Sequence, residues 1–248
     1  PYLRIKPNAD FVTDRYAQVN VEVYGGPILN TWFDRPLGIA GRVIVRSKDV
    51  FAPKTMLYRS GRPVLIIPNL AIHMNREVNK GVPTKANVDM LPLCATVADG
   101  WSKNGYLVGK LAEKLAVGAE EILSFELNAF CADKAQLVGF ERDFISSPRL
   151  DNITSVHAVV TALAAARGDG VNLAVLYDNE EIGSNTRRGA DSTMLSLLLE
   201  KIAAALGMDR TAMLDACLKG MFLSCDAAHA LHPNHPEYAD TSLSLIHI

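Results

Sequence analysis

The sequence predicts an α/β protein in which a β-rich block is inserted into a domain of alternating strands and helices. Short apolar runs in period-two alternation, interrupted by Gly and Pro, fill residues 19–123 and are typical of an antiparallel, half-buried sheet. From residue 124 onward, apolar runs alternate with segments of helical periodicity, which is typical of βα units around a parallel sheet. We therefore expect residues 1–18 and 124–240 to form the α/β domain and residues 19–123 to form the insertion.

Within the insertion, each element has its own local signal. The pattern predicts strands over residues 19–24, 39–45 and 63–68, and residues 92–98 are a further apolar run before a polar turn. Residues 106–117 have helical spacing, because Leu107, Leu111 and Leu115 fall on one stripe, and Gly118 is a plausible stop.

The α/β part is predicted to begin with a strand and then to alternate. Gly168 and Gly207 are placed to end two of its helices, and Asp191 or Ser192 to cap the second. The run 171–177 is short, apolar and bounded by Gly, so we expect a buried strand of a parallel sheet. The expected strands are 124–132, 171–177 and 221–225; the expected helices are 153–167, 192–206 and 211–219; residues 144–150 are expected to be an extended loop.

Composition bounds the functional class. A 248-residue chain with 49% apolar residues can form a packed core, and a net charge of −2 with mixed signs gives no basic surface for nucleic acid. No segment is long and apolar enough to predict a membrane span. The four cysteines lack Cys-x-x-Cys spacing, which favours buried free thiols, a reducing compartment and a cytoplasmic location over a disulfide scaffold.

Carboxylates recur at equivalent places in the predicted α/β part. Asp151 comes just before a helix, Glu180 and Glu181 follow one strand, and Asp226 follows another. Because open α/β sheets bind ligands outside the carboxyl ends of their strands, we expect these side chains to converge. Converging carboxylates repel one another unless a cation neutralises them, so the pattern indicates a divalent metal. Oxygen ligands alone suit magnesium or manganese, whereas zinc usually takes imidazole as well.

Six segments of the chain stand out as motifs: residues 24–26, 31–35, 72–76, 147–152, 178–184 and 226–234. In this order they resemble the conserved blocks of the M18 metallopeptidases, the aspartyl aminopeptidases. The resemblance implies a zinc-exopeptidase-like α/β/α catalytic domain, with residues 19–123 as an inserted dimerisation domain. It also implies release of N-terminal Asp or Glu from peptide substrates, and homo-oligomers in which dimers assemble to a dodecamer.

The resemblance also implies roles for single residues. Family members use two zinc ions; Asp151 matches the bridging carboxylate, and Glu181 and Asp226 match terminal ligands. Glu180 matches the general base, which would take a proton from water and give it to the leaving amine. His73 matches a histidine that reaches into a neighbouring subunit's active site.

The histidines after Asp226 admit two interpretations. His229 matches a family position near the metal centre. His229, His232 and His235 could instead form a separate histidine site, but a loop held by Pro233 and Asn234 explains His232 and His235 adequately.

The sequence also departs from the family. A zinc-binding histidine expected before Pro1 and another expected beyond the last residue are missing, and residues 241–248 do not resemble the family's continuation. We therefore expect a fragment with a non-native tail that lacks both family termini and is poorly folded or inactive as written. Two alternatives stay open: a magnesium-dependent phosphoryl-transfer or hydrolysis site, which no Gly-rich phosphate loop supports, and a non-catalytic assembly subunit.

Overall fold

A computed structural model describes residues 2–13, 15–98, 104–168, 170–228 and 230–238, without the side chains of Thr13, Glu181 and Ile182. The chain forms two compact units, Pro1–Ser146 (unit 1) and Ser147–Ile248 (unit 2). No helix in the described ranges is long and apolar enough to cross a membrane.

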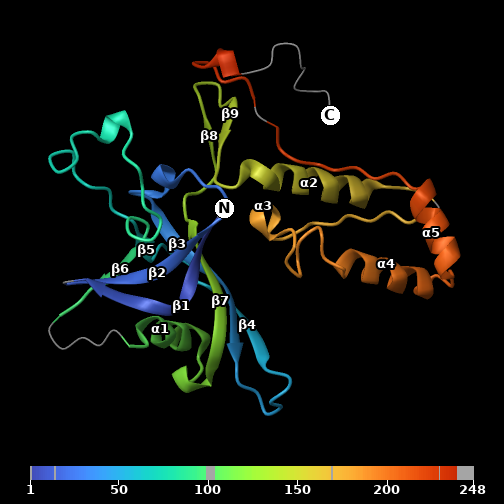
Figure 1. Cartoon of the computed structure of the whole chain (residues 1–248), viewed down its shortest axis with the longest axis horizontal. Coiled ribbons are helices and arrows are strands. Elements are labelled where there is room, and N and C mark those ends of the chain that lie inside the picture. Colours follow the sequence, from blue (N-terminus) through green and yellow to red (C-terminus); the bar gives the residue numbers. More distant parts are fainter. Residues whose placement is uncertain (1, 14, 99–103, 169, 229, 239–248) are drawn as a thin grey trace. The chain divides into compact units, whose positions relative to one another are not determined.

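Unit 1 is built around a closed antiparallel barrel, whose strands are drawn in blue to yellow-green in Figure 1. Six strands follow one another around it in the order β3, β5, β6, β2, β1 and β7, and β7 pairs again with β3. A seventh strand, β4, also pairs with β3. It pairs with residues 40–45 of β3, whereas β5 pairs with residues 36–37. The strands are β1 (Tyr2–Thr13), β2 (Tyr16–Tyr24), β3 (Pro36–Val45), β4 (Lys54–Arg59), β5 (Leu65–Ile66), β6 (Leu93–Thr96) and β7 (Ile122–Cys131).

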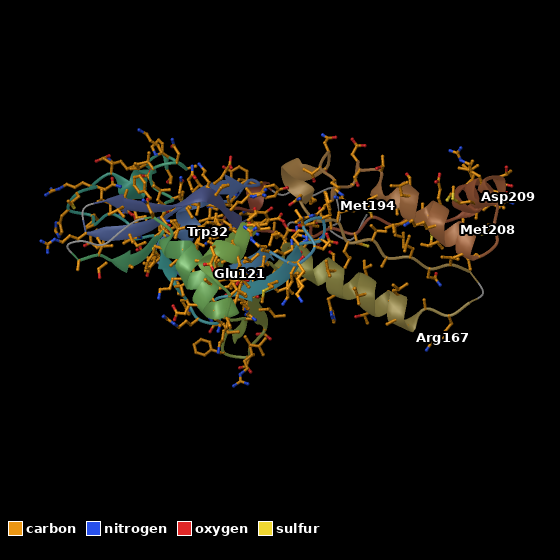
Figure 2. All side chains as sticks on the ribbon, turned by 90° about the horizontal axis from the view of Figure 1, so that it is seen from below. Trp32, Glu121, Arg167, Met194, Met208 and Asp209 are labelled. Atoms are coloured by element: carbon orange, nitrogen blue, oxygen red, sulfur yellow. The ribbon has the colours of Figure 1, made fainter. Side chains whose placement is uncertain are left out.

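The barrel core follows from alternation along the strands. In β2, Ala17, Val19 and Val21 are buried while the residues between them are more exposed, as a period of two requires. Trp32, which is labelled in Figure 2, joins this core from the 3-10 helix Leu29–Trp32. Other members of the core are Leu3, Ile5, Leu37, Ile39, Val43, Leu65, Ile67, Met90, Leu127 and Ala129.

Helix α1 (Tyr106–Leu115) adds to the same core, with Leu107 and Leu111 buried from the predicted stripe. The helix ends at Leu115, and the residue that caps it is Ala116, in the left-handed conformation, rather than Gly118. Two short 3-10 helices, Val78–Lys80 and Ala119–Glu121, lie in the connections, and β8 (Gln136–Val138) and β9 (Phe144–Ser146) form a separate hairpin.

Unit 2 consists of helices joined by extended segments. The helices are α2 (Leu150–Ala165), α3 (Glu180–Gly183), α4 (Met194–Ala205), α5 (Arg210–Lys219) and the 3-10 helix Pro236–Tyr238. Among the described residues of unit 2, Ala203 is the one buried apolar side chain, so this unit has no core comparable to that of the barrel. Large apolar side chains on α2 and α4, such as Ile153, Val160 and Leu197, are exposed instead.

Two expected strands are absent from unit 2. Residues 171–177 and 221–225 are extended but pair with no strand among the described residues, and Leu173 and Phe222 are exposed. A strand is stable only if neighbouring strands satisfy its backbone and cover its side chains. The prediction of strands here is wrong for this structure, because an apolar run does not specify the partners it needs.

The domain boundaries also differ from those expected. Residues 1–18 and 124–146 were expected in the α/β domain, but β1 pairs with both β2 and β7, and β7 pairs with β3 along most of its length. These ladders hold both segments in unit 1, so the boundary lies after Ser146. Period-two alternation predicts a strand without naming the sheet it joins.

The cysteines are free, as expected, but they are not all buried. Cys94 and Cys131 in unit 1 are partly buried, whereas Cys217 and Cys225 in unit 2 are exposed. The two exposed thiols lie on the part of the chain that has no packed core, which explains the difference from the prediction.

Candidate functional site

The structure brings the segments that carry Asp151 and Asp226 together within unit 2. Asp151 and Asn152 lie at the start of α2 with non-helical backbone angles, and the peptide bond between them is cis. The side-chain amide of Asn152 donates a long hydrogen bond of 3.4 Å to the carbonyl oxygen of Cys225, the residue before Asp226. Asp151 and Asp226 are therefore each adjacent in sequence to one residue of the hydrogen-bonded pair Asn152 and Cys225.

Asn152 has a second feature that the sequence did not indicate. Its Oδ1 atom is buried and has no hydrogen-bond partner among the described residues. An unpaired buried acceptor costs free energy unless a donor or a cation satisfies it. Asn152 is next in sequence to Asp151, so this amide oxygen and the Asp151 carboxylate are both ligands of the kind that a divalent cation binds.

The acidic turn of residues 178–181 leads into α3. Asn179 is left-handed, with φ of 59°, and its N–H donates to Oδ1 of Asp178 at 3.0 Å. Arg188 forms an ion pair with Oδ2 of Asp178, with 3.2 Å between Nη1 and Oδ2. Both Asp178 oxygens are thus engaged, one by Asn179 and one by Arg188. The side chain of Glu180 is exposed, and its carboxylate forms no hydrogen bond or ion pair with the described residues.

Asp226 and the histidines after it are held by local contacts. Oδ1 of Asp226 accepts the N–H of Ala227 at 2.7 Å. Nδ1 of His232 accepts the N–H of Asn234 at 3.2 Å, and Nδ1 of His235 lies 3.1 Å from Oε1 of Glu237. His229 lies outside the described residues. The contacts of His232 and His235 are those of an ordered loop.

His73 lies in unit 1, in a turn of the long connection between β5 and β6, and its side chain is exposed. The turn is closed by the N–H of Met74, which donates to the carbonyl of Ala71 at 2.9 Å. Its predicted role at a neighbouring subunit's site stays a prediction.

The described side chains do not by themselves complete a metal site. No group of three or more His, Cys, Asp or Glu side chains in the described part of the chain is close enough to hold a metal ion. Asp151 and Asp226 supply oxygen ligands of the right kind, but the side chain of Glu181 is outside the description. Two carboxylates are too few for zinc, which takes three or four protein ligands.

A cleft in unit 2 lies elsewhere. It has a volume of about 360 Å³ between α4 and α5 and contains none of the predicted site residues. Figure 2 shows Met208 and Asp209 at the connection between these two helices. The other residues that line this cleft are Glu200, Ala203, Ala204, Arg210 and Met213.

The chain is thus a mixed α/β protein with an antiparallel barrel and a carboxylate-bearing unit. The family model of the aminopeptidase I zinc metalloproteases (M18) matches residues 1–245. The chain belongs to this M18 family, and the resemblance described from its sequence motifs is confirmed.

Relatives and solved structures agree with this assignment. The chain is 44% identical over 242 residues to a probable M18 family aminopeptidase 2 of Clostridium novyi, covering 97% of this chain and 56% of the relative. It is 36% identical to aspartyl aminopeptidase 4 of Saccharomyces cerevisiae, covering 95% of this chain and 55% of that protein. The chain therefore spans little more than half the length of these relatives.

The fold is also similar to those of solved structures. A cryo-EM structure of a complex of Ape4 and Nbr1 matches with a TM-score of 0.84 and 32% identity, over 97% of this chain and 50% of that one. The structure of the S. cerevisiae mApe1 dodecamer matches with a TM-score of 0.72 and 27% identity, over 95% and 54% of the two chains.

Proposed function

We propose that these residues belong to a metal-dependent aminopeptidase that releases N-terminal residues, preferably Asp or Glu, from peptides. The match of the M18 zinc metalloprotease model to residues 1–245 carries the proposal. The preference for acidic residues is supported by the similarity to an aspartyl aminopeptidase. The link between Asn152 and Cys225 supports a shared site for Asp151 and Asp226, because it ties their two segments together.

The proposed roles follow the carboxylates of unit 2. Asp151, Glu181 and Asp226 would hold two zinc ions together with ligands that the described side chains do not supply. Zinc, when bound, polarises a peptide carbonyl and lowers the pKa of water. Glu180 is the proposed general base: its carboxylate accepts a proton from water and returns it to the nitrogen of the leaving amine. A carboxylate already committed to a turn contact, as in Asp178, is less suited to this exchange.

Self-association is part of the proposal. A relative of this fold forms a dodecamer, and we propose that the protein likewise forms homo-oligomers, with His73 of one subunit serving the site of another. The exposed turn that carries His73 leaves it accessible for such a role. We also propose a cytoplasmic location, which suits four free thiols.

A chimera tests the proposed chemistry. Residues 1–240 replace the matching region of the Clostridium novyi relative, and release of N-terminal Asp or Glu is measured together with bound zinc. We expect activity in the chimera and a loss of roughly 10²- to 10⁴-fold in Glu180→Gln with zinc content unchanged. Glu200→Gln, the same chemical change on α4, is the matched control and should keep full activity.

Two outcomes would count against the proposal. An active chimera that tolerates Glu180→Gln with metal retained refutes the base assignment. A folded, zinc-loaded chimera that is inactive on every peptide favours the non-catalytic assembly subunit instead.

A further inference from the structure

The connection between β5 and β6 carries His73 and is held by few contacts of its own. From Pro68 to Asp89 no residue is buried, and Figure 1 draws this part of the chain as loops with one short helix. The hydrogen bonds that residues 70–89 form with described residues join groups at most four residues apart. The place of the His73 turn therefore depends on how the connection leaves the barrel.

One pair of hydrogen bonds ties the start of the connection to the barrel. The N–H of Asn69 donates to Oδ1 of Asp34 at 2.9 Å, and the N–H of Asp34 donates to the carbonyl of Ile67 at 2.8 Å. Ile67 is a member of the barrel core. Asn69 lies four residues before His73, and its own Oδ1 accepts the N–H of Leu70 at 2.9 Å. Asp34 thus fixes the direction in which the chain leaves the core.

Asp34 is itself held by ordered parts of unit 1. It lies two residues after Trp32 of the core and two residues before Pro36, where β3 begins. Its neighbour Arg35 forms an ion pair with Asp133, with 3.0 Å between Nη1 and Oδ2. The Asp34 carboxylate is therefore a fixed acceptor for a connection that has no buried residue of its own.

The backbone of Asp34 explains why an aspartate suits this position. Its φ is +56°, in the left-handed region that Gly, Asn and Asp adopt more readily than other residues. Asp and Asn also carry a short side-chain acceptor, whereas Gly offers the conformation without the acceptor. Substitution can separate these two requirements: Asp34→Asn meets both, and Asp34→Gly meets only the first.

We propose that Asp34 is a positioning residue for His73, because its carboxylate holds the start of the connection that presents the His73 turn. This inference rests on the proposed function, in which His73 serves the site of another subunit. A group that acts at a reacting centre must be placed closely, since a misplacement of about 1 Å can cost ~10²-fold in rate. A hydrogen bond to a carboxylate is stronger than one between neutral groups, which suits it to this task.

Hydrogen exchange tests the contact without any activity. In the 248-residue chain, Asp34→Gly leaves the N–H of Asn69 without its acceptor, and we expect this amide to exchange about tenfold faster or more. Asp34→Asn keeps an oxygen acceptor and should keep the slow exchange. Asp49→Gly is the matched control, because Oδ1 of Asp49 accepts the N–H of Phe51 at 2.9 Å in the β3–β4 hairpin. It should leave exchange of the Asn69 amide unchanged.

Activity of the chimera of residues 1–240 with the Clostridium novyi relative tests the action through His73. We expect Asp34→Gly to lower kcat/KM for a peptide with N-terminal Asp about tenfold or more, and Asp34→Asn to stay within about threefold of the unsubstituted chimera. Asp49→Gly should leave activity unchanged. In a background of His73→Ala, Asp34→Gly should cost nothing further, because the side chain through which it acts is already gone.

Each measurement can contradict the positioning role. An Asn69 amide that exchanges equally fast in Asp34→Gly and in the unsubstituted chain excludes the anchoring contact. Full activity of Asp34→Gly in a chimera that His73→Ala impairs shows that the contact is dispensable. An equal loss from Asp34→Gly with and without His73 indicates a general loss of structure instead of positioning.

Failure of the proposed function would look different. A His73→Ala chimera with full activity contradicts the role of His73 itself, and the positioning role falls with it. The contact between Asp34 and Asn69 still stands or falls by the exchange measurement, which needs neither metal nor peptidase activity.

Discussion

Gly41 gives the sharpest test of how the barrel closes. It lies in β3 between its two partners, opposite Tyr58 of β4 and Leu127 of β7. Its φ is +154°, and a Cβ added there would lie 2.1 Å from the carbonyl oxygen of Glu126 and 2.9 Å from the Cα of Leu127. Both obstacles are backbone atoms, so no change of rotamer relieves the contact. Alanine at this position must push β3 and β7 apart.

The expected magnitude can be built from two contributions. A positive φ costs a non-glycine residue roughly 1–2 kcal/mol. Moving the two strands apart to reach an acceptable contact weakens the ladder on both sides of Gly41, and two backbone hydrogen bonds contribute about 1 kcal/mol each. We therefore expect Gly41→Ala to lower the free energy of unfolding of unit 1 by ~3–4 kcal/mol, a large part of the total for a typical domain.

Urea unfolding followed by tryptophan fluorescence measures this change. Trp32 belongs to the core of unit 1, so its fluorescence reports on the barrel. Gly81→Ala is the matched control, because Gly81 also has a positive φ, +89°, but has nothing within 4 Å of an added Cβ. We expect only the backbone contribution there, roughly 1–2 kcal/mol. Equal losses in the two variants would refute the steric argument.

Two further predictions concern single side chains. Burial, and next the charge of Asp10, raise the pKa of the Cys94 thiol from 9.0 to about 11, so at pH 8 its thiolate is about a hundredfold rarer than that of an ordinary cysteine. We expect a thiol reagent to modify the exposed Cys217 rapidly and Cys94 roughly a hundredfold more slowly at pH 8. The rate of Cys94 modification should still rise toward pH 11. Similar rates for the two thiols at pH 8 would contradict this prediction. Asp209 caps α5 by accepting the N–H of Ala212 at 2.8 Å, so Asp209→Ala should cost this helix about 1 kcal/mol and speed hydrogen exchange of its first-turn amides about fivefold. Asp215→Ala, inside the same helix, should not speed that exchange; if both variants speed it alike, the capping contact is not the cause.

The family and the local elements could be predicted from the sequence alone. The motifs around Asp151, Glu180 and Asp226 indicated the M18 family, and the family model confirms it. Helix α1 was predicted from the leucine stripe that it buries, and β2 from the alternation that places Val19 and Val21 inside the barrel. These signals are local, because the period of apolar residues reflects which side of an element is buried.

The tertiary structure decided which elements meet. It placed β1 and β7 in the barrel, left residues 171–177 and 221–225 without neighbouring strands, and joined Asn152 to Cys225. The roles of Glu180, His73 and the three metal ligands remain predictions, since they depend on contacts beyond those of the described residues. An apolar pattern indicates which side chains are buried. Strand pairing depends instead on backbone N–H and C=O groups, which nearly every residue has, so the pattern does not indicate which strand pairs with which. The sequence by itself therefore determined the family and the faces of its elements, and only the tertiary structure decided their partners.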